Sequence, residues 1–227
     1  FGFNGWGGKY LMDGDQEIGA ELAESAGLPV ASADWVLEGG ALDCDGTGLV
    51  ATTEQCLLNP NRNPHLTREQ IEQGLKDHLG VTTVIWLPFG HSLDTGPAGT
   101  DGHVDGVLQY IAPGRVLLEA VSHNASPEHE CGLRNLAELH ANRYARGRSL
   151  EVTILDPGPN ATVSYANHYL ANGAVIVPMG DDEADAPALD VLRRAHPDRE
   201  VVGVPGETIA FGGGGPHCIT QQIPEGT

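Results

Sequence analysis

The sequence is poor in cysteine, lysine and aromatic residues, and it has no long apolar run. Its four cysteines are far apart and form no CxxC pair, which excludes a disulfide framework and a structural zinc site and favours a reducing, cytoplasmic location. Its only lysines are Lys9 and Lys76 and the net charge is −19, so nucleic acid is not expected as a partner. No segment approaches the roughly 20 apolar residues of a membrane span, so no membrane partner is expected.

Glycine is abundant, and its longest run, Gly212 to Gly215, leads to a single thiol at Cys218. Glycine permits positive φ and lets a ligand approach the backbone closely. The run therefore either presents Cys218 as a nucleophile or forms a turn before a buried core cysteine. The rest of the chain favours the nucleophile.

A unit made of a hairpin, a helix and a strand occurs three times, with half a unit at each end. Thr67 and Gln70 form a capping box that predicts a helix to about Leu79. The other predicted helices are 16–26, 131–144 and 187–195. The predicted strands are 28–33, 35–44, 49–53, 83–87, 103–111, 115–121, 150–155, 164–170, 174–178 and 200–204, with a last hairpin over 208–222. Repeats of this length bury their faces against one another, which predicts an α/β fold of ββαβ units, and a ring of them would be completed by residues before Phe1.

Candidate functional residues fall at matching places in these units. Glu38, His103 with Asp105, Asn167 and Cys218 each belong to the leading strand of a predicted hairpin. We expect the four places to converge if the units pack around a common axis. Residues two apart on a strand project from one face, so His103 and Asp105 should act together.

Each of these signals has a simpler structural interpretation. A His-x-Asp pair can be a surface pair, and Glu38-Gly39-Gly40 can be a turn. Asn167 is expected to bond the backbone, and His217 is expected to point away from Cys218 and pack. Glu54, Asp94 and Asp101 are interpreted as loop or capping residues. The case for function rests on the equivalence of the positions within a repeat.

One thiol, one imidazole and two carboxylates suit chemistry on a cationic, planar carbon. The thiolate attacks, activated by a nearby imidazolium, while the carboxylates hold the positive charge and the histidine acts as acid and base. A guanidinium is the natural substrate, and the acidic chain would attract it mildly. A metal site of His103, Asp105 and Cys218 fits less well, because it mixes soft and hard ligands without a metal-site spacing.

Five segments resemble the agmatine deiminases, within the guanidino-group-modifying superfamily that includes arginine and bacterial peptidylarginine deiminases. They are spread over most of the chain in the family's order. The segments are FNGWGG at 3–8, LEGGALDCDGTGLVATTEQCLLNPNRNP at 37–64, VIWLPFG at 84–90, TDGHVDG at 100–106 and GGGGPHCITQQIP at 212–224.

The resemblance implies a five-bladed α/β propeller, the pentein fold, of which residues 1–227 would be a single deiminase domain that lacks the N-terminal blade portion. It implies hydrolysis of agmatine to N-carbamoylputrescine and ammonia, in putrescine and polyamine synthesis, with no cofactor and no metal. The partner would be a small cationic guanidine, and a homo-oligomer is compatible with the family.

The family's site residues carry over one by one. Cys218 matches the nucleophile that forms a covalent amidino thioether, and His103 matches the acid and base. Asp105 matches a carboxylate that binds the guanidinium. Glu38 matches the acidic residue that hydrogen-bonds the guanidinium and pairs with His103. Trp6 and Asn4 lie in a loop that should border the substrate pocket.

The sequence departs from the family in two segments. An upstream Trp-x-x-Arg-Asp-x-Gly-Pro segment, with a second guanidinium-gripping carboxylate, is absent. Gly215-Pro216 replace the usual Asn-Ile, and Pro216 removes a backbone N–H. Two other interpretations remain: an arginine or peptidylarginine deiminase, or a non-catalytic guanidine-binding fragment that needs the absent segment. Agmatine is favoured because it has no α-carboxylate and so needs no arginine in the pocket to bind one. Only Arg62 and Arg115 lie beside the motifs.

Overall fold

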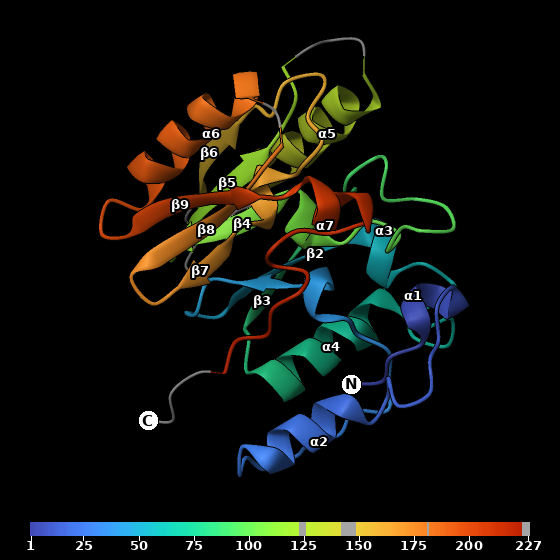
Figure 1. Cartoon of the computed structure of the whole chain (residues 1–227). Coiled ribbons are helices and arrows are strands. Elements are labelled where there is room, and N and C mark those ends of the chain that lie inside the picture. Colours follow the sequence, from blue (N-terminus) through green and yellow to red (C-terminus); the bar gives the residue numbers. More distant parts are fainter. Residues whose placement is uncertain (123–125, 142–148, 181, 224–227) are drawn as a thin grey trace.

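The computed structural model describes residues 1–122, 126–141, 149–180 and 182–223, and it contains three small mixed sheets (Figure 1). Each sheet has three strands, of which the first two are antiparallel and the last two are parallel. A long helix makes the crossover between the parallel strands, as a parallel connection requires. The repeated ββαβ unit predicted from the sequence is confirmed.

The three units have these bounds. The first consists of β1 (Asp43–Cys44), β2 (Leu49–Thr53), α3 (Glu54–Leu57), α4 (Arg68–Leu79) and β3 (Thr83–Leu87). The second consists of β4 (Leu108–Ala112), β5 (Arg115–Glu119), α5 (Pro127–Ala141) and β6 (Glu151–Leu155). The third consists of β7 (Tyr169–Ala171), β8 (Ala174–Met179), α6 (Asp182–Ala195) and β9 (Glu200–Pro205). Outside the units lie α1 (Gly5–Gly8), α2 (Ile18–Ser25) and α7 (Glu207–Phe211).

Each unit packs an apolar core between its sheet and its helix. In the first unit, Ile71 and Leu75 of α4 are buried among the same residues as Val50 of β2. The predicted capping box at Thr67 and Gln70 is present, and Gly80 ends α4 with a φ of 69°. Cores of this kind fix each sheet, so that the loop before its first strand is held at a defined place.

A short 3-10 turn precedes the first strand of every unit. These turns are η1 (Gly39–Ala41), η2 (Val104–Gly106) and η3 (Tyr165–Asn167). The turn η2 contacts both η1 and η3, so the three units meet at their turns. The predicted leading strands over 35–44, 103–111 and 164–170 are therefore too long at their starts.

Three other predictions about secondary structure need correction. Residues 28–33 form no strand, and residues 208–222 form α7 and a turn instead of a hairpin. The predicted helix over 131–144 begins earlier, at Pro127, and its predicted end lies outside the described residues. Glycine-rich sequence after Phe211 has no side chains with which to hold a strand against a neighbour.

The helix α2 lies at the edge of the molecule beyond α4 and buries none of its residues (Figure 1). Ile18 and Leu22, four positions apart on this helix, are 51% and 57% exposed. In the part of the chain that the structure describes, no helix is long and apolar enough to cross a membrane.

Candidate active site

The 3-10 turns, rather than the strands, bring the candidate residues together. Glu38 immediately precedes η1, His103 immediately precedes η2, Asp105 lies within η2, and Asn167 ends η3. The C-terminal segment after α7 runs across the middle of the molecule (Figure 1). Its Cys218 contacts Asn167 and Asp105. The predicted convergence is thus observed for these positions, although the elements that carry them differ from the prediction.

Asn167 fixes the backbone around Cys218. Its side-chain oxygen accepts from the Cys218 N–H at 3.2 Å, and its main-chain oxygen accepts from the His217 N–H at 3.2 Å. Its amide nitrogen lies 3.0 Å from Cys218 Sγ. The backbone-bonding role predicted for Asn167 is confirmed, and the residue also contacts the thiol directly.

The thiol of Cys218 faces a carboxylate. Its Sγ lies 3.3 Å from Oδ2 of Asp105. Although Cys218 as a residue is exposed, its sulfur is partly desolvated, and this burial together with the Asp105 charge raises the pKa of Cys218 to about 12. The expected activation by an imidazolium is therefore not seen in the substrate-free site, where the thiol is protonated at neutral pH.

The prediction that His217 points away from the site and packs is wrong. His217 Nδ1 lies 2.9 Å from Asp105 Oδ2, the same oxygen that the thiol contacts. Burial opposes the charged form of His217, but Asp105 outweighs it and raises the pKa of His217. His217 therefore holds the Asp105 carboxylate in place beside Cys218.

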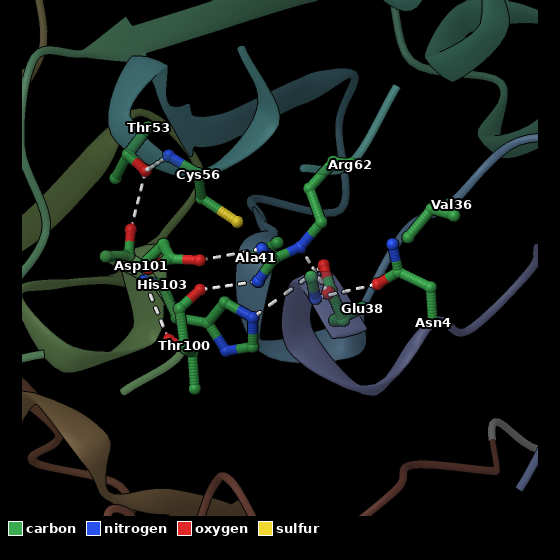
Figure 2. Close-up of polar contacts among 12 residues, drawn as sticks. Asn4, Val36, Glu38, Ala41, Thr53, Cys56, Arg62, Thr100, Asp101 and His103 are labelled. Carbon is green, nitrogen blue, oxygen red and sulfur yellow. Dashed lines mark hydrogen bonds and ion pairs between the residues drawn. The ribbon is translucent and has the colours of Figure 1, made fainter. Parts of the chain in front are cut away.

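Glu38 is held by a buried arginine that the sequence motifs did not identify as part of the site. Arg62 Nε donates to Glu38 Oε1 at 2.6 Å, and its Nη1 donates to Asp101 Oδ2 at 2.8 Å (Figure 2). Burial raises the pKa of Glu38, but His103 and Arg62 outweigh it, so that the pKa is lowered. Glu38 is consequently an anion whose orientation is set by a charge-assisted hydrogen bond.

His103 lies beside Glu38, with Nε2 3.9 Å from Glu38 Oε2. Its backbone N–H donates to Asp94 Oδ2 at 3.2 Å, so Asp94 holds the loop before His103, in agreement with the loop role among the two predicted for it. Burial disfavours the imidazolium, but Cys56, Glu38 and Asp105 around the ring raise the pKa of His103 to about 10. His103 is therefore a cation at neutral pH and can donate a proton.

The N-terminal loop reaches the site through Trp6, whereas Asn4 supports the loop. Trp6 lines a cavity of about 1040 Å³ together with Glu38, His103 and Cys218. Asn4 Nδ2 donates to Asn61 O at 2.9 Å, and its Oδ1 accepts from the Gly7 N–H at 2.8 Å. Asn4 is absent from the described lining of this cavity. A second cavity, of about 330 Å³, also meets His103 and Cys218, and Asp105 lines it.

Glycines make this packing feasible. A Cβ at Gly40 would lie 2.5 Å from His103 Nδ1 and 2.8 Å from Asp105 Oδ2. A Cβ at Gly215 would lie 2.6 Å from Asn167 Oδ1. The glycine run before Cys218 is therefore needed in part so that Asn167 can approach the backbone.

Replacing Gly40 with alanine should displace His103 or Asp105 and lower turnover about 100-fold, the effect expected of a misplacement near 1 Å. Gly39→Ala is the matched control, because its nearest contact, Gln221 Oε1, is 3.8 Å away. The measurement is kcat/KM of both variants for agmatine, the substrate that the sequence resemblance implies, with the melting temperature as a check on folding. Equal activities of the two variants would contradict the placement of His103 and Asp105.

Comparisons with known proteins show which family the chain resembles. The sequence model of the Porphyromonas-type peptidyl-arginine deiminase family matches residues 1–224. An agmatine deiminase of Pseudomonas putida is 40% identical over 99% of this chain and 68% of that protein. A putative agmatine deiminase of Vibrio parahaemolyticus is 38% identical over 98% of this chain and 69% of that protein. The solved structure of agmatine deiminase from Enterococcus faecalis matches with a TM-score of 0.89 and 35% identity, over 98% of this chain and 68% of that one.

Proposed function

The chain belongs to the Porphyromonas-type peptidyl-arginine deiminase family, with agmatine deiminases among its relatives, and from this premise we propose that it hydrolyses the guanidinium group of agmatine. The products are N-carbamoylputrescine and ammonia, the first of which leads toward putrescine. The observation that carries the proposal is the contact of Cys218 Sγ with Asp105 at 3.3 Å, in cavities that His103 also lines.

The charge around the site favours agmatine over arginine. Neither cavity has a lysine or an arginine among its described lining residues. Arg62 is buried and engaged with Glu38, Asp101 and the Thr100 carbonyl oxygen. A substrate α-carboxylate would therefore enter without a lysine or arginine partner, and the cationic His103 already faces Glu38 at 3.9 Å. An unpaired buried charge is strongly unfavourable. Agmatine lacks that carboxylate.

Substrate binding supplies the activation that the free thiol lacks. The guanidinium lies between Asp105 and Glu38, which bond its N–H groups. The positive charge of the guanidinium offsets the negative charge of the Asp105 carboxylate, and this lowers the pKa of Cys218. The thiol loses its proton to solvent water in the cavity, and the thiolate attacks the central guanidinium carbon.

His103 moves the protons of the two steps. In the first step the C–S bond forms, His103 protonates one terminal nitrogen, and the C–N bond to that nitrogen breaks to release ammonia. In the second step the neutral imidazole accepts a proton from water, and the hydroxide attacks the amidino carbon. The C–S bond then breaks and the hydroxyl proton passes to solvent, which returns the thiolate and releases N-carbamoylputrescine.

The three ββαβ units are also proposed to be blades of the pentein propeller, within a single deiminase domain. Their 3-10 turns meet one another, as turns around a common axis would. Asp105 and Asn167 come from successive units, and the segment carrying Cys218 occupies the corresponding place after the third unit.

Comparing agmatine with arginine tests the substrate. We expect kcat/KM to be at least about 100-fold higher for agmatine than for L-arginine, since an uncompensated carboxylate costs about 3 kcal/mol or more. Calorimetric binding to the Cys218→Ala variant measures the same preference without turnover. Tighter binding of arginine, or its faster turnover, would overturn the choice of agmatine.

A further inference from the structure

Three buried side chains with different donor atoms converge behind the larger cavity. They are Glu38, Cys56 and His103, whose oxygen, sulfur and nitrogen atoms all lie within 4.8 Å of one another. Their exposed fractions are 6%, 0% and 7%. Figure 2 shows the sulfur of Cys56 directed toward the Arg62 and His103 side chains. No other set of three such residues meets this spacing within the described part of the chain.

Two of the three donor atoms lack a hydrogen-bond partner. Glu38 Oε2 and His103 Nε2 are both buried and both unsatisfied. They form an ion pair at 3.9 Å, a separation too long for a hydrogen bond. Buried polar atoms without a hydrogen bond are unfavourable, and such atoms in a native structure call for a ligand or a functional reason.

The local backbone fixes the position of Cys56. Cys56 lies on α3. The hydroxyl oxygen of Thr53, the N-cap residue of α3, accepts a hydrogen bond from the Cys56 N–H at 3.1 Å. Cys56 packs against the apolar core of the first unit. Arg62 fixes Glu38 from the other side through Oε1, which leaves Oε2 free for another ligand. The three donors are thus presented by ordered elements.

We propose that Glu38 Oε2, Cys56 Sγ and His103 Nε2 form a binding site for a thiophilic divalent cation such as Zn²⁺, and that this cation inhibits the enzyme. Thiolate, imidazole and carboxylate are the usual zinc ligands, and three of them leave a fourth position for water. Glu38 and His103 line the larger cavity, so the cation can enter from it. Cys56 binds as its thiolate and His103 as its neutral imidazole, so binding displaces the protons that both groups carry.

Charge balance supports one divalent cation. The Cys56 thiolate and the Glu38 carboxylate offset its two charges, and neutral His103 adds none. The neighbouring Arg62 guanidinium remains paired with Asp101 Oδ2 at 2.8 Å, and Asp101 Oδ1 also binds Lys9 at 2.7 Å. Because the protons displaced from Cys56 and His103 balance the two charges of the cation, binding leaves the net charge of the group unchanged.

Inhibition follows from shared residues and rests on the proposed deiminase function. A cation on Glu38 and His103 occupies the carboxylate that bonds the guanidinium and the imidazole that moves the protons. It also places positive charge where the substrate's cation must lie, which disfavours substrate binding electrostatically.

Zinc binding to the Cys218→Ala variant tests the site without turnover and without the other thiol of the active site. Calorimetric titration should give one tight equivalent of Zn²⁺, and Co²⁺ in its place should give a sulfur-to-metal absorption band. Adding Cys56→Ser should weaken binding at least about 100-fold and remove the band. Cys131→Ser is the matched control and should leave both unchanged. Absent binding, or binding that Cys56→Ser leaves intact, would overturn the site.

Folding and activity give independent checks. The melting temperatures of Cys56→Ser and Cys56→Ala show whether a variant that no longer binds Zn²⁺ is still folded. Loss of Zn²⁺ binding in a folded variant supports the site. With Cys218 present, Zn²⁺ should inhibit agmatine turnover, a chelator should restore it, and Cys56→Ser should need at least about 10-fold more Zn²⁺. Unchanged sensitivity would overturn the inhibitory role. Zinc binding without any deiminase activity would leave the site standing and contradict the proposed function instead.

Discussion

Turnover of agmatine should fall by at least about 10⁴-fold when Cys218 is replaced by alanine, because the covalent route then has no nucleophile. The fold should remain, since the residue is exposed and its sulfur contacts only polar groups of the site, Asp105 and Asn167. The measurement is release of ammonia and N-carbamoylputrescine, with the melting temperature alongside it.

Cys131→Ala is the matched control for this substitution, because Cys131 lies on α5 and is not among the described lining residues of either cavity. The control should keep its turnover within a factor of two or so. Turnover by Cys218→Ala at a rate near that of the control would exclude Cys218 as the nucleophile.

Replacing Asp105 with asparagine should have two opposite effects. Turnover should fall about 10²–10⁴-fold, because the variant loses the charge that binds the guanidinium and helps to orient it. Alkylation of Cys218 by iodoacetamide should become faster, because the nearby negative charge that helps to raise the thiol pKa to about 12 is gone. A lower pKa means more thiolate at any pH below it, and the thiolate is the reactive form.

The pH dependence of labelling separates this effect from general disorder. In the unsubstituted chain, alkylation of Cys218 should keep rising well above pH 9, whereas in Asp105→Asn the rise should occur at lower pH. Mass spectrometry of the peptide that carries Cys218 measures the rate for this thiol alone. Slower labelling in Asp105→Asn would contradict the contact between the carboxylate and the thiol.

The sequence predicted the repeating unit well because the unit is encoded locally. The capping box at Thr67 and the glycine at position 80 define the ends of α4 within a few residues of chain. The apolar run 83–87 gives β3 with the predicted bounds. Period and capping depend on neighbours in the chain, so a sequence is enough to find them.

The elements that carry the site were harder to predict, because long-range contacts determine them. Glu38, His103 and Asn167 were placed on strands, but each lies in or beside a 3-10 turn that packs against the turn of another unit. The glycines at these turns do indicate, from the sequence, places where other side chains pack closely against the backbone. Gly40 is one example, since it leaves room for His103 and Asp105, which come from the next unit.

The roles of Arg62, His217 and Cys56 depend on partners far along the chain. Arg62 meets Asp101 across 39 positions, and His217 meets Asp105 across 112. A single sequence carries no signal for such pairs. The Asn-Pro-Asn-Arg-Asn-Pro segment around Arg62 did mark a structured loop, and its conformation is what places the guanidinium beside Glu38.

The covalent step is tested most directly by stopping the reaction with acid and weighing the peptide that carries Cys218. We expect this peptide to gain the mass of agmatine less ammonia during turnover, to lose it when the substrate is exhausted, and to stay unmodified in Cys218→Ala. Continued turnover with Cys218 unmodified at every time, or the same mass on another residue, would contradict attack by this thiol.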